Sequence, residues 1–299
     1  MELHPGGGEP SPTEAADPNG REASVEGVIH YVDPGVPIGA INDVDREKST
    51  LPLIAHRMRI RDVRSRQGEL GLERTGFVWL RRETAVRDFS DPSAIERVYL
   101  PQTARLVEEL LGAQKVVTFG HVVRDGALTL SRHGPVFNAH IDYDERTVRA
   151  VAVRLLGEQE YERRSRQRIV LVNVWRPILP VQSAPLALCD ASSVESADLV
   201  YGPIGGRSAS GVAGAAGWNL GYSPKHRWHY LSRMQPHEVL VFKLCDTDRS
   251  RVQWTAHTGF EDPASEPDAA PRRSIEVRTL AFVAEEARRE AARYEEPRG

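Results

Sequence analysis

Cysteine and long apolar runs are both scarce in this sequence. Only Cys189 and Cys245 occur among 299 residues, and no CxxC motif is present. Two cysteines cannot cross-link a chain of this length, so we expect a reduced, cytoplasmic protein. No apolar stretch approaches the roughly 18 residues of a membrane helix, and the N-terminus lacks the basic and apolar regions of a signal peptide. We therefore expect no membrane association.

An excess of basic charge is also missing. The net charge is -3 at pH 7, although 39 residues are Lys or Arg. Proteins that bind nucleic acid through its phosphates carry a basic excess, so we expect no nucleic-acid partner. Apolar residues make up 40% of the chain and charged residues 27%, a balance typical of a folded domain with a sizeable core.

The composition changes along the chain and suggests one domain with two tails. Residues 1–25 hold few large apolar side chains, which predicts a disordered tail. A single domain is expected over residues 26–283, and a charged helix or tail over 284–299. Within the domain, residues 200–222 are dense in Gly, Ala and Ser and show no hairpin or helix pattern. A loop of this length is commonly a cover over a functional site, so we expect a lid here.

Hydrophobic periodicity predicts many strands and few helices. Residues 56–63 alternate strictly, with three arginines on one side and Met58 and Ile60 on the other, as in a half-buried strand. Helical spacing of apolar residues appears at 91–113 and 145–156. Further strands are expected at 27–33, 76–80, 116–124, 169–175, 185–189, 238–243, 252–256 and 274–282. Helices early and strands late indicate an α+β fold with a mainly β core, a sandwich or a barrel.

The residues most suggestive of chemistry are His140, Asp142 and His257. In a strand, residues i and i+2 face the same side, so the imidazole of His140 and the carboxylate of Asp142 can converge. His257 lies in a second strand-like segment. Two imidazoles and one carboxylate on one face of a metal are the usual ligands of a non-haem Fe(II) that activates O2.

A possible carboxylate-binding pair follows the second histidine. Arg272 and Ser274 are also spaced i and i+2 at the start of a predicted strand. An arginine fork binds a carboxylate through two parallel hydrogen bonds, and a hydroxyl can add a third. Arg273 competes for this role. Arg176 could contact a co-substrate or substrate, or could be a buried arginine bound by backbone carbonyls.

Several short motifs follow one another in the order seen in a known family. They are residues 75–77 (TGF), 87–92 (RDFSDP), 140–142 (HID), 173–177 (NVWRP), 185–190 (PLALCD), 234–243 (MQPHEVLVFK), 257–263 (HTGFEDP) and 271–278 (PRRSIEVR). With these motifs the chain resembles the CmcJ/AsaB-type hydroxylase/desaturase family of Fe(II)/2-oxoglutarate-dependent dioxygenases. Three departures are Tyr143, where glutamine is frequent, and His237 and Arg273, where an acidic residue is common.

The resemblance implies a double-stranded β-helix (jelly roll) with flanking helices. It also implies Fe(II) on His140, Asp142 and His257, and 2-oxoglutarate on Arg272 and Ser274, with O2 as the oxidant. We therefore expect an oxygenase that hydroxylates, desaturates, epoxidises or cyclises a small natural product of secondary metabolism. Two alternatives stay open: a jelly-roll helper protein that partners a methyltransferase without turnover, and a cupin-like metal enzyme without co-substrate. The sequence does not indicate an oligomeric state.

Overall fold

The computed structural model describes residues 23–39, 41–42, 51–127, 134–143, 145–205 and 216–284. The predicted N-terminal tail lies outside these residues except at its end, where Ser24 already begins a strand. The predicted C-terminal helix or tail also lies outside them, apart from residue 284. In the described part of the chain, no helix is long and apolar enough to cross a membrane.

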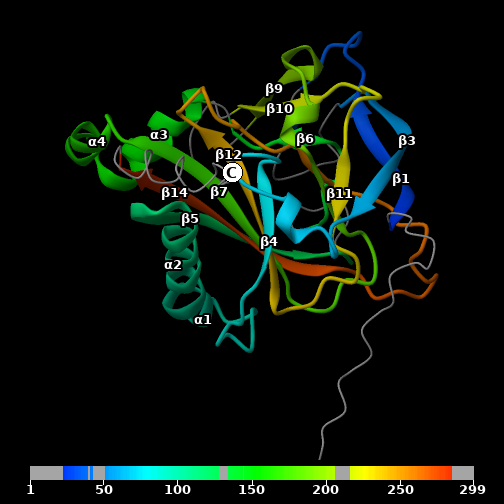
Figure 1. The fold of residues 1–299 in the computed structure, drawn as a ribbon, viewed down its shortest axis with the longest axis horizontal. Coiled ribbons are helices and arrows are strands. Elements are labelled where there is room, and N and C mark those ends of the chain that lie inside the picture. Colours follow the sequence, from blue (N-terminus) through cyan, green and yellow to red (C-terminus); the bar gives the residue numbers. More distant parts are fainter. Residues whose placement is uncertain are drawn as a thin grey trace, which may run out of the picture.

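Two β-sheets form the body of the protein (Figure 1). The larger has nine strands within the described residues, in the order β1-β3-β11-β8-β13-β6-β10-β9-β2. These strands are β1 (Ser24–Val32), β2 (Ile41–Asn42), β3 (Leu53–Asp62), β6 (His140–Ile141), β8 (Leu186–Cys189), β9 (Leu199–Gly205), β10 (Ala216–Leu220), β11 (Trp228–Tyr230) and β13 (His257–Gly259). An isolated bridge between Val28 and Glu261 brings β1 back beside the segment after β13, so this sheet is strongly curved.

The smaller sheet has five antiparallel strands in the order β4-β12-β7-β14-β5 among the described residues. They are β4 (Phe77–Arg81), β5 (Ala113–Asp125), β7 (Arg168–Pro177), β12 (Glu238–Asp246) and β14 (Arg273–Val283). The helices are α1 (Pro92–Ala94), which continues through a π-helical turn (Ile95–Tyr99) into α2 (Leu100–Leu111), then α3 (Glu145–Leu156) and α4 (Glu158–Arg164). Short 3-10 turns occupy Gln67–Glu69, Ala191–Ser193 and Ser196–Asp198.

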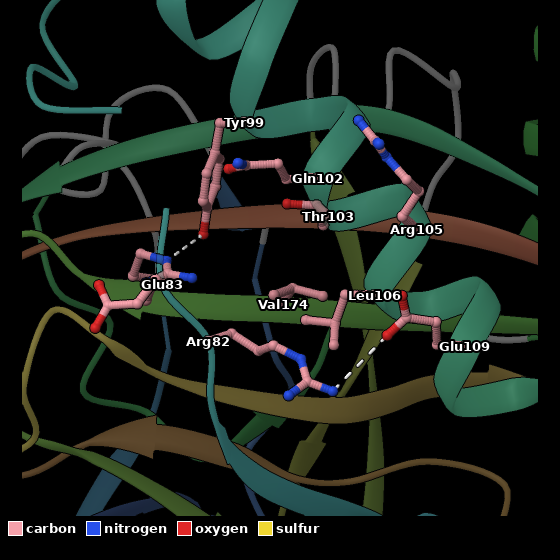
Figure 2. Close-up of a pocket in the computed structure, with 10 residues that line it drawn as sticks. Arg82, Glu83, Tyr99, Gln102, Thr103, Arg105, Leu106, Glu109 and Val174 are labelled. Carbon is pink, nitrogen blue, oxygen red and sulfur yellow. Dashed lines mark hydrogen bonds and ion pairs between the residues drawn. The ribbon is translucent and has the colours of Figure 1, made fainter. Parts of the chain in front are cut away.

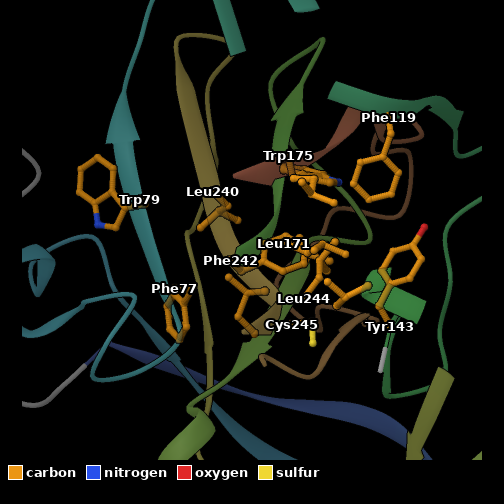
Figure 3. Packing of buried hydrophobic residues seen from close by; sticks show 14 of the residues in the cluster. Phe77, Trp79, Phe119, Tyr143, Leu171, Trp175, Leu240, Phe242, Leu244 and Cys245 are labelled. Atoms are coloured by element: carbon orange, nitrogen blue, oxygen red, sulfur yellow. The ribbon is translucent and has the colours of Figure 1, made fainter. Parts of the chain in front are cut away.

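The main core lies between the two sheets (Figure 3). Leu171 and Trp175 of β7 face it together with Phe242 of β12, while Leu188 enters from the larger sheet. The alternate residues of β7, such as Val174, face the other way and pack against α2. All ten residues of β7 are therefore buried, because a sheet with apolar groups on both faces must be covered on both.

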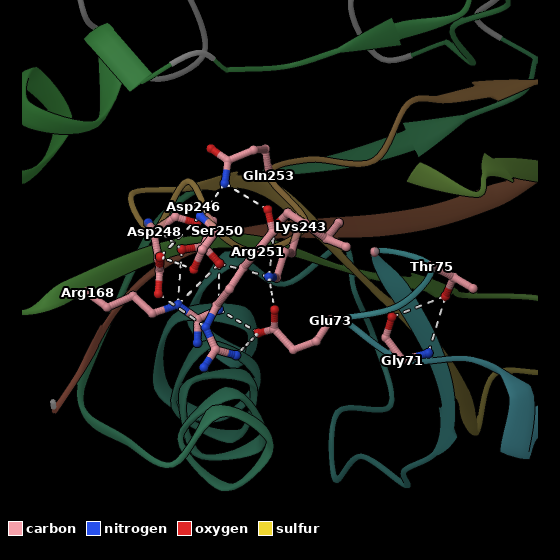
Figure 4. Close-up of polar contacts among 12 residues, drawn as sticks. Gly71, Glu73, Thr75, Arg168, Lys243, Asp246, Asp248, Ser250, Arg251 and Gln253 are labelled. Atoms are coloured by element: carbon pink, nitrogen blue, oxygen red, sulfur yellow. Dashed lines mark hydrogen bonds and ion pairs between the residues drawn. The ribbon is translucent and has the colours of Figure 1, made fainter. Parts of the chain in front are cut away.

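A buried charge network holds one end of the smaller sheet (Figure 4). Lys243 and Asp246 of β12 are fully buried, and their Nζ and Oδ2 atoms lie 2.8 Å apart. Lys243 also reaches Glu73 at 2.9 Å, and Arg168 of β7 donates to Asp246 and Glu73. Each charge has partners, as burial requires.

Most predicted elements are confirmed, and the mainly β fold with them. Residues 56–62 of the predicted strand at 56–63 lie in β3 with Met58 and Ile60 buried, and both predicted helices are present. The strand predicted at 252–256 is wrong. Residues 252–256 make single contacts, such as the hydrogen bond from the Thr255 hydroxyl to the Gly76 carbonyl. Strand pairing with β8 begins only at His257.

The expected loop at 200–222 also needs correction. Residues 199–205 and 216–220 form the antiparallel pair β9–β10, and β10 pairs in turn with β6. Pairing with neighbouring strands overrides the low strand propensity of Gly and Ala. Residues 206–215 of the predicted lid lie outside the described part of the chain.

Candidate metal centre

The three predicted ligands meet between neighbouring strands of the larger sheet. His140 in β6 is paired directly with His257 in β13, and Asp142 follows β6. The ring centroids of the two histidines are 4.3 Å apart. One ligand atom from each of the three residues lies within 4.8 Å of the others. Paired residues in a sheet face the same side, which explains why the ladder gathers these side chains at one point.

Backbone carbonyls orient both imidazoles. The Nδ1 atom of His140 lies 2.8 Å from the Asn138 carbonyl, and that of His257 lies 3.2 Å from the Thr255 carbonyl. When Nδ1–H donates to a carbonyl, the Nε2 lone pair is left for a metal, as in most protein metal sites. The Nε2 atom of His140 is 3.4 Å from Oδ1 of Asp142. The donor set therefore fits a divalent cation of the Fe(II) type.

Burial and neighbouring charges keep the ligands in their metal-binding protonation states. Burial alone would raise the pKa of Asp142, but the Arg278 guanidinium, together with the two imidazoles once acid protonates them, outweighs burial and holds the pKa well below its usual value. Burial, with a smaller effect of His140, lowers the pKa of His257 to about 4. At neutral pH the carboxylate is ionised and the imidazole of His257 is neutral, and these forms bind metals.

A chain of charged side chains, missed in the sequence, supports Asp142. The Nε atom of Arg278 lies 3.5 Å from Oδ2 of Asp142, and its Nη2 donates to Glu276 at 2.7 Å. Arg124 of β5 donates twice to Glu276, at 3.0 and 2.9 Å. Burial would raise the pKa of Glu276, but Arg124 and Arg278 outweigh it and bring it to about 2. The i+2 spacing that joined Arg272 to Ser274 continues to Glu276 and Arg278, and that signal could have found them.

Arg272, and not Arg273, faces the triad. Arg272 is 3% exposed and lines one pocket with His140, Asp142 and His257. Its guanidinium carbon is 5.4 Å from the Trp175 ring centroid, and Nη1 donates to the Ala184 carbonyl. The space between these side chains is about 20 Å³, less than the volume of a dicarboxylate. Arg273 faces the other side of β14, with Nε 3.6 Å from Oδ2 of Asp125.

Two buried polar side chains on the inner face suit a polar ligand. Ser274 is fully buried, and its hydroxyl has no hydrogen-bond partner among the described residues. Asn173 on β7 is also fully buried, and neither its amide nitrogen nor its oxygen has one. Such groups are rare, since an unmade buried hydrogen bond costs about 1–3 kcal/mol. The hydroxyl of Ser274 therefore fits a carboxylate beside Arg272, and Asn173 is a further polar group of this interior.

Arg176 lies away from the triad, so its position does not support the expected contact between Arg176 and a co-substrate. Successive residues of a strand face opposite sides, and Trp175 faces the triad. Arg176 therefore points toward α2, where it lines a pocket of about 260 Å³. Tyr99 and Gln102, which Figure 2 shows, line the same pocket. The Nε atom of Arg176 donates to the Tyr99 hydroxyl at 3.1 Å, and Nη1 donates to the Pro236 carbonyl. The alternative of a buried arginine bound by a backbone carbonyl describes it correctly.

Tyr143, which follows the triad aspartate, belongs to the apolar core. It is 4% exposed and packs edge-on against Phe119, with ring centroids 5.9 Å apart (Figure 3). Its side chain does not line the described pocket at the triad. The tyrosine that stands where glutamine is frequent therefore affects the packing of the core next to Asp142.

Comparison with known proteins identifies the family. A family described as an oxidoreductase/YMDC permease-like domain matches residues 31–282. The alpha-ketoglutarate-dependent dioxygenase tstK of Talaromyces stipitatus is 30% identical over 282 residues, 88% of this chain and 99% of tstK. The hydroxylase/desaturase efuI of Hormonema carpetanum is 28% identical over 267 residues, 82% of this chain and 88% of efuI.

A solved structure extends the likeness to three dimensions. The iron and alpha-ketoglutarate-dependent endoperoxidase NvfI superposes with a TM-score of 0.79 at 25% identity, covering 88% of this chain and 99% of NvfI. The chain belongs to the hydroxylase/desaturase family of Fe(II)/2-oxoglutarate-dependent dioxygenases, which are oxidoreductases of secondary metabolism. The predicted family and the jelly-roll core are thereby confirmed.

Proposed function

We propose that this protein uses Fe(II), 2-oxoglutarate and O2 to oxidise a C–H bond of a small natural product. His140, Asp142 and His257 hold the metal, and Arg272 with Ser274 holds the far carboxylate of 2-oxoglutarate. The observation that carries the proposal is the approach of three ligand atoms to within 4.8 Å of one another. Two imidazoles and one carboxylate on one side leave the other side of the cation for co-substrate and O2.

The bound metal with its co-substrate supplies an oxidant strong enough to remove hydrogen from an unactivated carbon. The chain's own residues bind and orient. Arg272 offers a fork of donors to a carboxylate, and Ser274 adds a hydroxyl donor from the same face of β14. Arg278 holds Asp142 through its second oxygen. The metal therefore meets ligands that are already oriented.

The surroundings of the triad keep water away from the reacting atoms. Trp175, Val136 and Leu186 line the pocket with the ligands. Exclusion of water protects a reactive species from side reactions. The pair β9–β10, which lies beside β6, is in our proposal part of the cover over the site. Hydroxylation, desaturation and ring closure would each begin with removal of a hydrogen from carbon, whereas epoxidation of an alkene would add an oxygen atom to the double bond, so the substrate would decide among them.

Release of succinate tests the proposal against the helper-protein alternative. The purified chain with Fe(II), ascorbate, O2 and 2-oxoglutarate should form succinate, and the His257→Ala variant should lose both bound Fe(II) and succinate formation. His237→Ala is the matched control, because His237 lies outside the triad pocket. A chain that binds Fe(II) but forms no succinate, even with extracts that contain candidate substrates, would favour the helper that partners a methyltransferase. Turnover without 2-oxoglutarate would favour a cupin-like enzyme.

A further inference from the structure

A pocket of about 260 Å³ lies on the face of the smaller sheet that α2 covers. Tyr99 and Gln102 line it from the helical side, and Val174 lines it from β7 (Figure 2). Arg176, two residues further along β7, lines it as well. Trp175 lies between these two strand residues and lines the triad pocket on the opposite face. The sheet therefore separates the pocket beneath α2 from the metal centre.

Arg176 is a buried cation without a counter-ion. It is 3% exposed, and its guanidinium carbon lies 5.5 Å from the centroid of the Tyr99 ring. Its Nε donates to the Tyr99 hydroxyl and its Nη1 to the Pro236 carbonyl, and both of these partners are neutral. No carboxylate of the described residues forms an ion pair with Arg176, and Nη2 donates to none of their oxygens. Buried charges are ordinarily paired, because removing a charge from water is costly.

Two other buried arginines of the same sheet show what Arg176 lacks. Arg168 of β7 donates to Asp246, and Arg124 of β5 donates twice to Glu276. Arg176 is more buried than either of them. The remaining donors of its guanidinium therefore call for an anion, and the pocket that Arg176 lines is the place where one can bind.

The charges around the pocket are suited to a single negative charge. Three arginines and two glutamates line it, so the lining carries one net positive charge. Arg82 and Glu109 form an exposed pair, with Nη2 and Oε2 3.8 Å apart. Arg105 and Glu83 are also exposed, so water and salt screen their charges. The positive charge that is least screened is that of Arg176.

The rest of the lining favours a small ligand that is partly apolar. The Oε1 atom of Gln102 accepts a hydrogen bond from the Thr84 hydroxyl at 2.8 Å, which leaves the amide nitrogen to donate. Leu106 of α2 and Val174 of β7 supply apolar walls. The volume is below that of most drug-sized sites, which begin at about 300 Å³, so the ligand must be small.

We propose that this pocket binds a small monocarboxylate, with its carboxylate on Arg176 and its apolar part between Leu106 and Val174. A guanidinium binds a planar carboxylate through parallel hydrogen bonds, and the amide of Gln102 adds a donor. The proposal does not depend on the function proposed above, because the triad takes no part in it. The bound molecule is not the one that is oxidised, since the sheet lies between it and the metal ligands.

Calorimetric titration of the full chain with benzoate at neutral pH tests the proposal, with acetate as a smaller carboxylate and benzamide as a neutral analogue of benzoate. Benzoate should bind, and benzamide should bind about tenfold or more weakly, because it cannot form hydrogen bonds between two charged groups. Arg176→Gln should weaken benzoate binding by a similar factor. Arg97→Gln is the matched control: Arg97 is an exposed arginine of the π-helical turn and lies outside the pocket. It should leave the affinity unchanged.

Two further variants separate this site from a general loss of structure and from the metal centre. Glu83→Gln removes a negative charge from the lining and should strengthen benzoate binding about twofold or more, a direction that a damaged fold does not produce. Arg272→Gln, which alters the proposed co-substrate site, should still bind benzoate. Absence of binding by both carboxylates, equal affinity for benzamide, equal effects of Arg176→Gln and Arg97→Gln, or loss of binding in Arg272→Gln would each overturn the proposal. If Arg176→Gln does not fold, Glu83→Gln and the comparison with benzamide decide.

Discussion

Arg278 and Asp142 are joined by a contact of 3.5 Å between Nε and Oδ2, while the other carboxylate oxygen of Asp142 lies 3.4 Å from His140. The aspartate thus has one oxygen near the fellow ligand and one near a buried guanidinium. Arg278 is held in turn by Glu276, and Glu276 by Arg124. This chain crosses from β5 to the metal centre and fixes the carboxylate before any cation arrives.

We expect Arg278→Gln to weaken metal binding about 10- to 100-fold, the usual cost of losing a residue that orients a ligand. Arg278→Lys should recover part of the affinity, because it keeps the charge but not the fork. The measurement is titration with Fe(II) or Co(II) under anaerobic conditions. Arg273→Gln, on the outer face of β14, is the control. Unchanged affinity in Arg278→Gln would show that Asp142 needs no such support.

We expect Arg272→Gln to raise the KM for 2-oxoglutarate about 10- to 100-fold, because a charge-assisted hydrogen bond to the carboxylate is lost. Arg273→Gln should change it less than twofold, since Arg273 pairs with Asp125 at the surface. Initial rates of succinate formation at varied 2-oxoglutarate give both values. A larger effect at Arg273 would reverse the assignment.

Arg176→Gln should lower the free energy of unfolding by about 1–3 kcal/mol, because the Pro236 carbonyl and the Tyr99 hydroxyl lose a buried partner. The KM for 2-oxoglutarate should stay the same, since Arg176 faces α2. Urea unfolding and steady-state kinetics on one preparation check both statements. A raised KM at unchanged stability would contradict the position of Arg176 in the structure.

Asp246→Asn should lower the free energy of unfolding by about 3–5 kcal/mol, because it leaves Lys243 and Arg168 buried with less compensating charge. Glu195→Gln removes an exposed ion pair with Lys225 and should cost less than about 1 kcal/mol. Chemical denaturation measures both variants. Similar losses in the two would mean that the buried network adds no more than a surface pair.

Acid should weaken the same network. Burial alone would raise the pKa of Asp246, but Arg168 and Lys243 outweigh it, and the pKa lies below 3.8 in the folded chain. A carboxyl group with a depressed pKa binds protons more readily when unfolded. Its stabilisation is therefore complete above about pH 4 and is lost as the pH falls through the folded value. Acid unfolding should be less steep in Asp246→Asn than in the parent chain.

The sequence predicted that His140, Asp142 and His257 come together, and the structure brings them together; their role as metal ligands stays a prediction. The H-x-D spacing sets two ligands on one face, and the motifs around His257 and Arg272 identified the partners. The sequence could not show that Arg176 faces α2. When a buried strand is apolar on both faces, its residue pattern does not tell which face packs against which neighbour. Asn173 was missed for a related reason, and the i+2 spacing could have placed Glu276 and Arg278 on the inner face without showing their partners. Their roles depend on which strands lie opposite one another, and pairing of distant strands is a tertiary property.

The β9–β10 pair was mistaken for a loop because its strands are stabilised by a neighbour and not by their own composition.

The pairing of His140 with His257 has a consequence for iron supply. β6 is two residues long and β13 is three, so these strands contribute little pairing of their own. A cation held by both would cross-link segments that are distant in the chain, and ligand binding to the folded state raises its stability by mass action. Cells starved of iron should then contain less of this protein, because the unliganded form opens more often and reaches proteases sooner.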